Sequence, residues 1–117
     1  MVSLVLGGTA MCGYYDEIEN LRHHIDECYK EPTFKDAENM LLEDRRKMNS
    51  KHWAAYHVLS SIYDNPLEDP LDCLNDFLNE LNVTLTFDVK QDINIAHYKA
   101  AIEAVEELIN YLKARRN

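Results

Sequence analysis

A chain of 117 residues with 46% hydrophobic and 28% charged residues is long enough for one domain with a single core, and its composition is globular rather than disordered. The formal net charge of −9 argues against direct binding of nucleic acid, or of an anionic membrane surface, through a basic patch. Three cysteines at wide spacings do not suggest a disulfide framework, so we expect a cytoplasmic protein, of a bacterium or of the host cell of a virus.

The first residues form a short apolar run, from Val2 to Leu6, followed by two glycines. This run has no basic residue before it and is too short for a signal peptide or a membrane span, so we expect no membrane segment here. Its aliphatic and β-branched residues predict a short strand at 2–6. The glycine-rich stretch 7–13 could form a phosphate-binding turn, but no βαβ pattern follows it. A simple strand-to-helix turn is the better interpretation.

Helical periodicity begins at about Tyr14 and continues to about Tyr29. Thr33 is the expected N-cap of a second helix, with Asp36 as the reciprocal capping carboxylate. The 34–63 segment is either one helix or two, with the pair Asn49-Ser50 as the expected interruption. The apolar positions of the two segments are Tyr14, Ile18, Leu21, Ile25 and Cys28, then Phe34, Ala37, Met40, Leu41, Ala55, Tyr56, Val58, Leu59, Ile62 and Tyr63.

Asp69 and Pro70 are typical of a helix start, as N-cap and first helical residue. The helix they begin is expected to end at Asn82 and to bury Leu71, Leu74, Phe77, Leu78 and Leu81. From Val83 to Val89 apolar and polar residues alternate, which predicts a strand. Because a lone strand leaves its backbone unpaired, this strand would pair with 2–6 or across a dimer.

The last quarter of the chain carries heptad spacing, which predicts a helix from Ile93 to Arg116. Ala101 and Leu108 widen its apolar stripe, which favours docking on the chain's own core over a coiled coil. The stripe consists of Ile95, Tyr98, Ile102, Val105, Ile109 and Leu112. The fold class predicted is therefore mainly α: a four-helix bundle-like single domain over 1–117, with a minor β element near 2–6 and 83–89. No motif is specific enough to name a family.

Histidine, cysteine and carboxylate pairs occur at helical spacing, but they form no complete metal site. His24 and Cys28 are four residues apart, as are Glu19 and His23, yet no set of four ligands appears. We therefore predict no metal site, no cofactor and no catalytic residue.

A metal-dependent nucleotide hydrolase is nevertheless an alternative function. Clustered helical carboxylates hold Mg²⁺ in all-α nucleotide pyrophosphatases, and Asp16, Glu19, Glu43 and Asp44 could line such a cleft. Only Asp16 and Glu19 have the required spacing of three, and the next helix supplies no second pair. A solvated face is the better interpretation of these residues.

Charge gives the strongest functional signal. Seven acids and no Lys or Arg lie between Asp64 and Asp88, which accounts for −7 of the net charge of −9. Asp72, Asp76 and Glu80 are four residues apart, so they should form a row along the outer side of their helix. The alternative interpretation is an ordinary solvated acidic helix. The functional interpretation of the row is a surface that imitates a phosphate backbone and occupies a basic, nucleic-acid-binding groove of another protein.

Trp53 and His57 fall opposite the inward-facing positions of their helix, where a tryptophan is either an interface anchor or a second core contact. The predicted function is a small acidic, non-enzymatic module that binds and inhibits a protein with a basic surface, by analogy with phage-encoded antagonists of this size and charge. A structural homodimer, joined through the last helix or through strand 83–89, is a further alternative. The predicted partner-binding residues are Glu68, Asp69, Asp72, Asp76, Glu80, Trp53 and His57.

Overall fold

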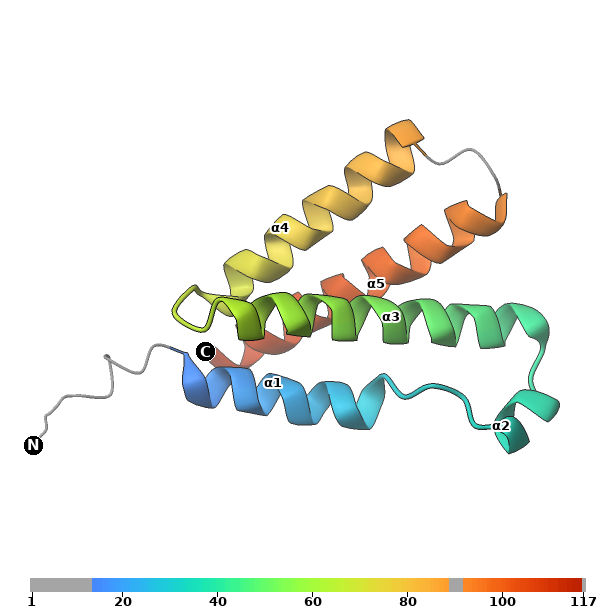
Figure 1. Ribbon diagram of the computed structural model, residues 1–117, viewed down its shortest axis with the longest axis horizontal. Helices are drawn as coiled ribbons and strands as arrows, with labels where there is room; N and C mark the ends of the chain where they lie inside the picture. Colours follow the sequence, from blue (N-terminus) through green and yellow to red (C-terminus); the bar gives the residue numbers. More distant parts are fainter. Residues whose placement is uncertain (1–13, 89–91, 117) are drawn as a thin grey trace, which may run out of the picture.

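The computed structural model describes residues 14–88 and 92–116, and within them the chain is mainly helical (Figure 1). The predicted helical bundle is confirmed. The elements in chain order are α1 (Tyr15–Cys28), α2 (Phe34–Glu38), α3 (Leu42–Asp64), α4 (Pro70–Val83), the π-helix η2 (Thr84–Asp88) and α5 (Asp92–Arg116).

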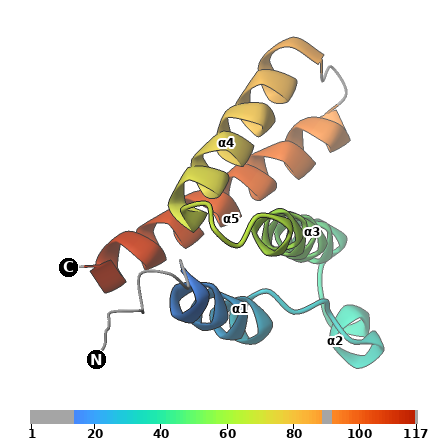
Figure 2. The same cartoon turned by 60° about the vertical axis from the view of Figure 1, so that its left-hand side comes forward.

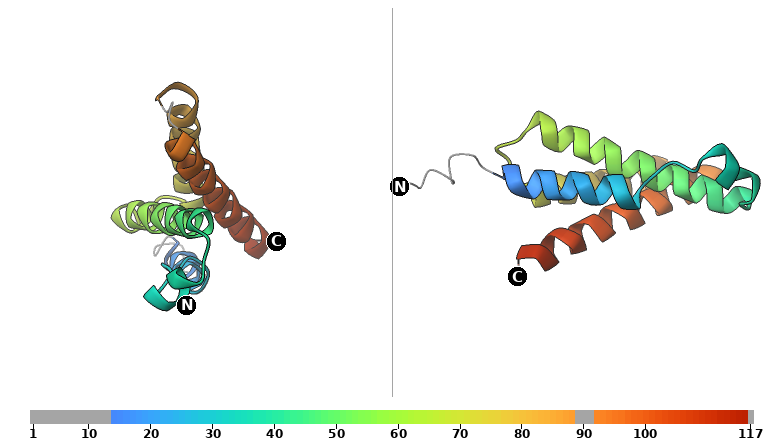
Figure 3. Two further views of the ribbon diagram at one scale, coloured as in Figure 1. Left: turned by 90° about the vertical axis from the view of Figure 1, so that its right-hand side faces the viewer. Right: turned by 90° about the horizontal axis from the view of Figure 1, so that it is seen from below.

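Two antiparallel helix pairs make up the bundle. α1 and α3 run side by side in opposite directions, and α4 and α5 form a hairpin inclined across them (Figures 1 and 2). α5 is in contact with α1, α3 and α4, most extensively with α3. Its C-terminal end returns to the side of the bundle where α1 begins (Figure 3). The last helix is therefore docked within its own chain, as its wide apolar stripe predicted.

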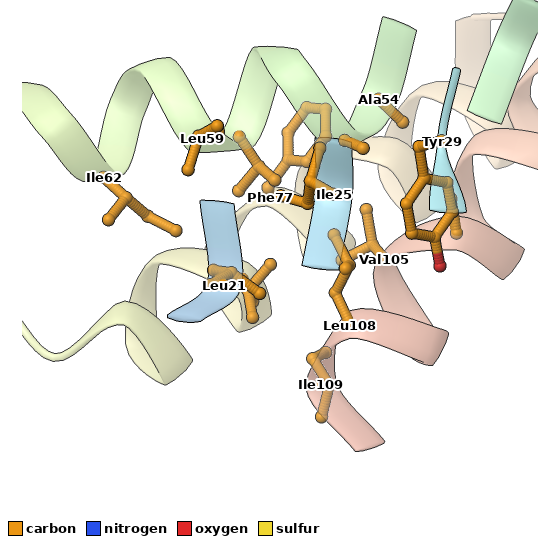
Figure 4. Packing of buried hydrophobic residues seen from close by; sticks show 14 of the residues in the cluster. Leu21, Ile25, Tyr29, Ala54, Leu59, Ile62, Phe77, Val105, Leu108 and Ile109 are labelled. Carbon is orange, nitrogen blue, oxygen red and sulfur yellow. The ribbon is translucent and has the colours of Figure 1, made fainter. Parts of the chain in front are cut away.

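One hydrophobic core lies where α1, α3, α4 and α5 meet. Leu21 and Ile25 of α1 face the apolar sides of α3 and α5 (Figure 4). The buried residues of the other three helices include Ala54, Ala55, Val58, Leu59, Ile62, Leu74, Phe77, Leu81, Ala101, Ala104, Val105, Leu108, Ile109 and Leu112. The inward positions predicted for these helices are largely confirmed, but Cys28 is exposed and its neighbour Tyr29 is buried instead.

Small residues set the contact of α5 with its neighbours. Ala100 and Ala104 are buried together with the predicted Ala101 and Leu108, whereas Ile95 and Tyr98 of the heptad stripe are only half-buried. The buried face is thus rotated away from the strict heptad seam. Alanines let two helix backbones approach closely, and α3, which packs on α5, also buries two of them, Ala54 and Ala55.

Two predicted helix starts are confirmed. Thr33 Oγ1 accepts from the Asp36 amide at 3.1 Å, and the Asp36 carboxylate accepts from the Thr33 amide at 3.3 Å, which completes a capping box. Asp69 Oδ1 accepts from the Leu71 amide at 2.9 Å, with Pro70 in the first helical position.

The 34–63 segment is two helices, but they do not separate at Asn49-Ser50. α2 ends at Glu38 and α3 runs unbroken from Leu42 to Asp64. Inside α3 the Ser50 Oγ donates to the Arg46 carbonyl oxygen at 2.9 Å, so the serine hydroxyl is satisfied within the continuous helix. The predicted apolar side of the first part is wrong as well: Phe34 is 93% exposed and Leu41 is also exposed.

The predicted strand at 83–89 is wrong for all of its described residues. α4 continues to Val83 and then widens into η2, which ends at Asp88. No strand occurs in the described ranges that could pair with this segment, whereas a continued helix supplies its own backbone hydrogen bonds. β-branched residues cost a helix only a few tenths of a kcal/mol each, so the local alternation did not decide the structure. Residues 2–6, the other predicted strand, lie outside the described residues.

Candidate functional site

An acidic row lies on the outer side of α4. Asp72, Asp76 and Glu80 are all exposed, with one helical turn, about 6 Å of rise, between successive carboxylates. In the described part of the chain, no ion pair joins any of them to a basic side chain, and the same holds for Glu68 in the preceding turn. The acidic row, defined here as Asp72, Asp76 and Glu80, is an exposed strip of uncompensated negative charge.

Asp69 differs from the other predicted acids because it has two structural partners. It caps α4, and its carboxylate also accepts from the guanidinium of Arg116, with 3.2 Å from Nη1 to Oδ2. The hydrogen bond from Arg116 lowers the pKa of Asp69, and the backbone bond from Leu71 lowers it further. Arg116, from the C-terminal end of α5, thus lies against the start of the acidic region.

Trp53 is the centre of an aromatic cluster at the junction of α3, α4 and α5. Its ring stacks on His57 with 5.3 Å between centroids, and it lies 4.9 Å from His97 and 6.1 Å from Phe77. Trp53 is nevertheless 38% exposed. The ring therefore packs on the edge of the core, as one interpretation from the sequence has it, and also leaves accessible surface, so its role as an interface anchor stays a prediction.

Phe77 brings the aromatic cluster next to the acidic row. It stacks on His57 at 5.0 Å, and it lies between Asp76 and Glu80 along α4. Glu80, three residues further on, is the member of the acidic row closest to Phe77 around the helix, but Phe77 is buried and Glu80 is exposed. The structure thus brings Trp53 and His57 against α4 through Phe77, while Glu68 and Asp69 lie at the N-terminal end of that helix, next to Asp72.

A second group of residues, not predicted from the sequence, surrounds a hollow on α3 that Trp53 also lines. His52 donates from Nδ1 to the Tyr29 carbonyl oxygen at 2.6 Å, and its Nε2 lies 3.1 Å from Glu31 Oε1. Together with Asn49, Trp53, Tyr56 and His57, these two side chains line an open hollow of about 490 Å³. The sequence contained no signal for Glu31, because it comes from the linker between α1 and α2.

A larger groove, of about 1090 Å³, separates the N-terminal halves of α3 and α5. Its walls carry both signs of charge, with Arg46, Lys47 and Lys99 against Glu43, Asp92 and Glu103. Lys47 already pairs with Glu103 at 3.3 Å. The balance of charges gives this groove no preference for an acidic or a basic ligand.

Ser50 and His97 meet on the wall of that groove, with 2.7 Å between Oγ and Nδ1. The Ser50 hydroxyl proton is directed at the Arg46 carbonyl oxygen, so Oγ accepts from His97 Nδ1. A catalytic serine needs the reverse arrangement, in which the imidazole accepts the hydroxyl proton. The pair satisfies two polar groups near the core and lacks the geometry of a nucleophile.

The fold separates the carboxylates that would have formed a hydrolase site. α1 and α3 are antiparallel, so Asp16 lies at one end of the bundle while Glu43 and Asp44 lie at the other (Figure 1). Glu19 accepts from the Tyr63 hydroxyl at 2.9 Å and pairs with Arg22 at 3.3 Å. Over residues 14–88 and 92–116, no group of three or more metal-ligating side chains comes together.

His24 and Cys28 are in contact at 3.7 Å between Nδ1 and Sγ, and no third ligand joins them in the ranges given above. The glycine-rich stretch 7–13 lies outside the described residues. None of the helices that the structure describes is both long enough and apolar enough to cross a membrane.

Comparisons with known proteins add no functional information. No protein-family model, no curated protein and no solved structure matches this chain. We therefore infer the function from the exposure, charge and contacts of the residues above.

Proposed function

We propose that this protein is a non-enzymatic binding module whose acidic row engages a basic surface of another protein. The observation that carries the proposal is the exposure of Asp72, Asp76 and Glu80 on α4, without a basic partner among the described side chains. Several charges on other helices are paired, as those of Arg22, Lys51 and Arg116 are with neighbouring carboxylates.

The acidic row does not stabilise the helix that carries it. Like charges four residues apart cost a few tenths of a kcal/mol per pair, and only the member nearest the N-terminus of α4 recovers part of this from the helix dipole. A strip of one sign instead accelerates association with a complementary surface and rejects acidic ones. These properties support a role in partner recognition.

The finer proposal is inhibition by imitation of a phosphate backbone. The regular spacing of the carboxylates on a rigid helix gives a line of negative charge that a nucleic-acid-binding groove could accept. Trp53 and His57 contact α4 through Phe77, and the exposed part of Trp53 provides apolar contact area of the kind that anchors protein interfaces.

The experiment compares two variants of equal charge. The tagged protein captures partners from a lysate of its native host, and bound proteins elute in a salt gradient. Reversal of the charge of the acidic row, by Asp72→Lys, Asp76→Lys and Glu80→Lys together, should abolish capture of the basic partner. The matched control reverses three exposed acids on other helices, Glu27→Lys, Glu38→Lys and Glu106→Lys, and should retain it. Equal capture by both variants would contradict the proposal. Displacement of nucleic acid from the purified partner then tests inhibition.

A homodimer is the second candidate, favoured by apolar side chains at the end of the α4–α5 hairpin. Phe87 of η2 is 72% exposed, and Val83 and Ile93 are exposed at the same end of the hairpin (Figure 1). The dimer would use this helical surface instead of the predicted strand. Light scattering after size exclusion tests it: a mass that falls from dimer to monomer in Phe87→Glu supports the dimer, and a monomeric wild-type protein at high concentration rejects it.

A further inference from the structure

The hollow on α3 is lined by two aromatic pairs that lie side by side. His52 and Tyr56 are 4.7 Å apart, and Trp53 and His57 are 5.3 Å apart, each pair being separated by one helical turn. Asn49 lies one turn before them, and Glu31 reaches the hollow from the α1–α2 linker. An open site with flat aromatic walls and a carboxylate at its edge has the chemistry that recognises an organic cation.

The side chains of this hollow are held in place before any ligand arrives. The Tyr56 hydroxyl donates to the Asp26 carboxylate, and His52 Nδ1 donates to the Tyr29 carbonyl oxygen. Trp53 also packs against His97 and Phe77. Such preorganisation reduces the entropy that a ligand would otherwise lose on binding.

When the imidazole of His52 is neutral, neither atom of its contact with Glu31 carries a hydrogen to donate. Nδ1 of His52 must carry a hydrogen, because a carbonyl oxygen can only accept. In the neutral ring Nε2 then presents its lone pair, and it lies 3.1 Å from the Glu31 carboxylate, a second acceptor. No donor atom fits between two acceptors 3.1 Å apart, so with a neutral ring both atoms need a donor that lies beside them. The Glu31 side chain is 69% exposed, so a donor from outside can reach both.

We propose that this hollow binds the guanidinium group of an arginine on a partner protein, an inference that rests on the basic partner of the proposed function. The guanidinium donates to Glu31 and to Nε2 of neutral His52, and its flat face lies against Trp53. Arginine fits better than lysine because its five donors lie in one plane and its face stacks on aromatic rings. The volume of about 490 Å³ accommodates the group with its alkyl stem.

Trp53 is the one tryptophan of the chain, so its fluorescence reports on the hollow directly. The probes are capped tripeptides Gly-Arg-Gly, Gly-Lys-Gly and Gly-citrulline-Gly, added to the purified protein without any partner. At pH 8 an ordinary imidazole is neutral, and salt near 0.15 M weakens binding to the acidic row. The arginine peptide should give a saturable change in Trp53 emission, and the uncharged isostere citrulline should give none.

Two variants assign the response to the hollow. Glu31→Gln removes the charge of an exposed side chain and should weaken binding of the arginine peptide about tenfold. Glu38→Gln, a matched change at an exposed position of α2, should leave binding unchanged. The proposal is overturned by an equal response to citrulline or lysine, by no saturable response, or by unchanged binding in Glu31→Gln. Because no partner is present, this result is independent of the capture experiment with the acidic row.

Discussion

Arg116, near the end of α5, forms an ion pair with Asp69, the N-cap residue of α4. The same guanidinium donates to Glu17 of α1 at 2.6 and 2.7 Å. One side chain therefore ties together three helices at the end of the bundle away from the groove between α3 and α5. The raised pKa of Arg116 has these two hydrogen-bonded carboxylates as its main cause, so this guanidinium stays charged at any pH at which the protein is folded.

Asp69 should contribute to stability through its cap and through its charge, and two variants separate these effects. Asp69→Ala removes both and should lower the free energy of unfolding by about 1–2 kcal/mol. Asp69→Asn keeps an oxygen that can cap α4 but loses the charge, so its cost should be smaller. Urea unfolding at low and high salt measures the free energy of unfolding of both variants. An equal loss of stability in Asp69→Ala and Asp69→Asn would contradict this division.

The ionisation of Asp69 should also make the stability of the protein depend on pH. The folded protein holds the pKa of Asp69 below its ordinary value of 3.8, chiefly through Arg116. The stabilisation is therefore fully present above the unfolded pKa and is lost as the pH falls through the folded pKa. The stability difference between the wild-type protein and Asp69→Asn should shrink as the pH falls below 3.8. A constant difference would contradict the lowered pKa.

His97 should make the protein less stable in mild acid. Burial lowers its pKa below the ordinary 6.5, and its Nδ1 donates to Ser50. Below pH 6.5 the unfolded chain binds a proton that the folded protein takes up only at lower pH, so stability falls with pH in this window. His97→Gln removes the titrating group, and its unfolding midpoint in urea should change less between pH 7.5 and 5.5. Identical pH profiles would show that His97 does not contribute.

The buried face of α5 should tolerate neither removal nor addition of volume. Leu108→Ala empties a fully buried site and should cost about 2–5 kcal/mol. Ala104→Leu adds bulk where no surface is accessible and should cost about 1–3 kcal/mol. Glu106→Ala, on the exposed side of the same helix, is the control and should change stability by less than about 0.5 kcal/mol. A tolerated Ala104→Leu would mean that α5 does not pack through its alanines.

Local signals in the sequence identified most of the helices. The capping box at Thr33 and the Asp69-Pro70 start depend on residues within one turn of each other, so they are readable without knowledge of the fold. The segment from Val83 was misread for the opposite reason. Its alternation fits a strand, but a strand forms only with a neighbour, and that neighbour is a property of the tertiary structure.

The candidate sites also contain features that nearby residues determine and contacts that only the tertiary structure determines. Exposure of the acidic row followed from the helical period of α4 alone, because the apolar positions fixed which side faces outward. The partners of Asp69 and His52 could not be predicted from the helical period, because Arg116 lies 47 residues from Asp69 and the Tyr29 carbonyl lies 23 residues from His52. Contacts of such separation depend on how the helix pairs cross.

Neutralisation of one carboxylate should show that the acidic row is not needed for stability. Asp76 is flanked four residues away on each side by Asp72 and Glu80, so Asp76→Asn removes two repulsions at once and should raise the free energy of unfolding by a few tenths of a kcal/mol. The gain should disappear at high salt, because exposed charges are screened. Glu106→Gln, an exposed change on α5, is the matched control and should give no comparable gain. Thermal unfolding at two salt concentrations measures the effect. A loss of stability in Asp76→Asn would indicate that the row stabilises α4, and would remove the reason to assign its charges to a partner.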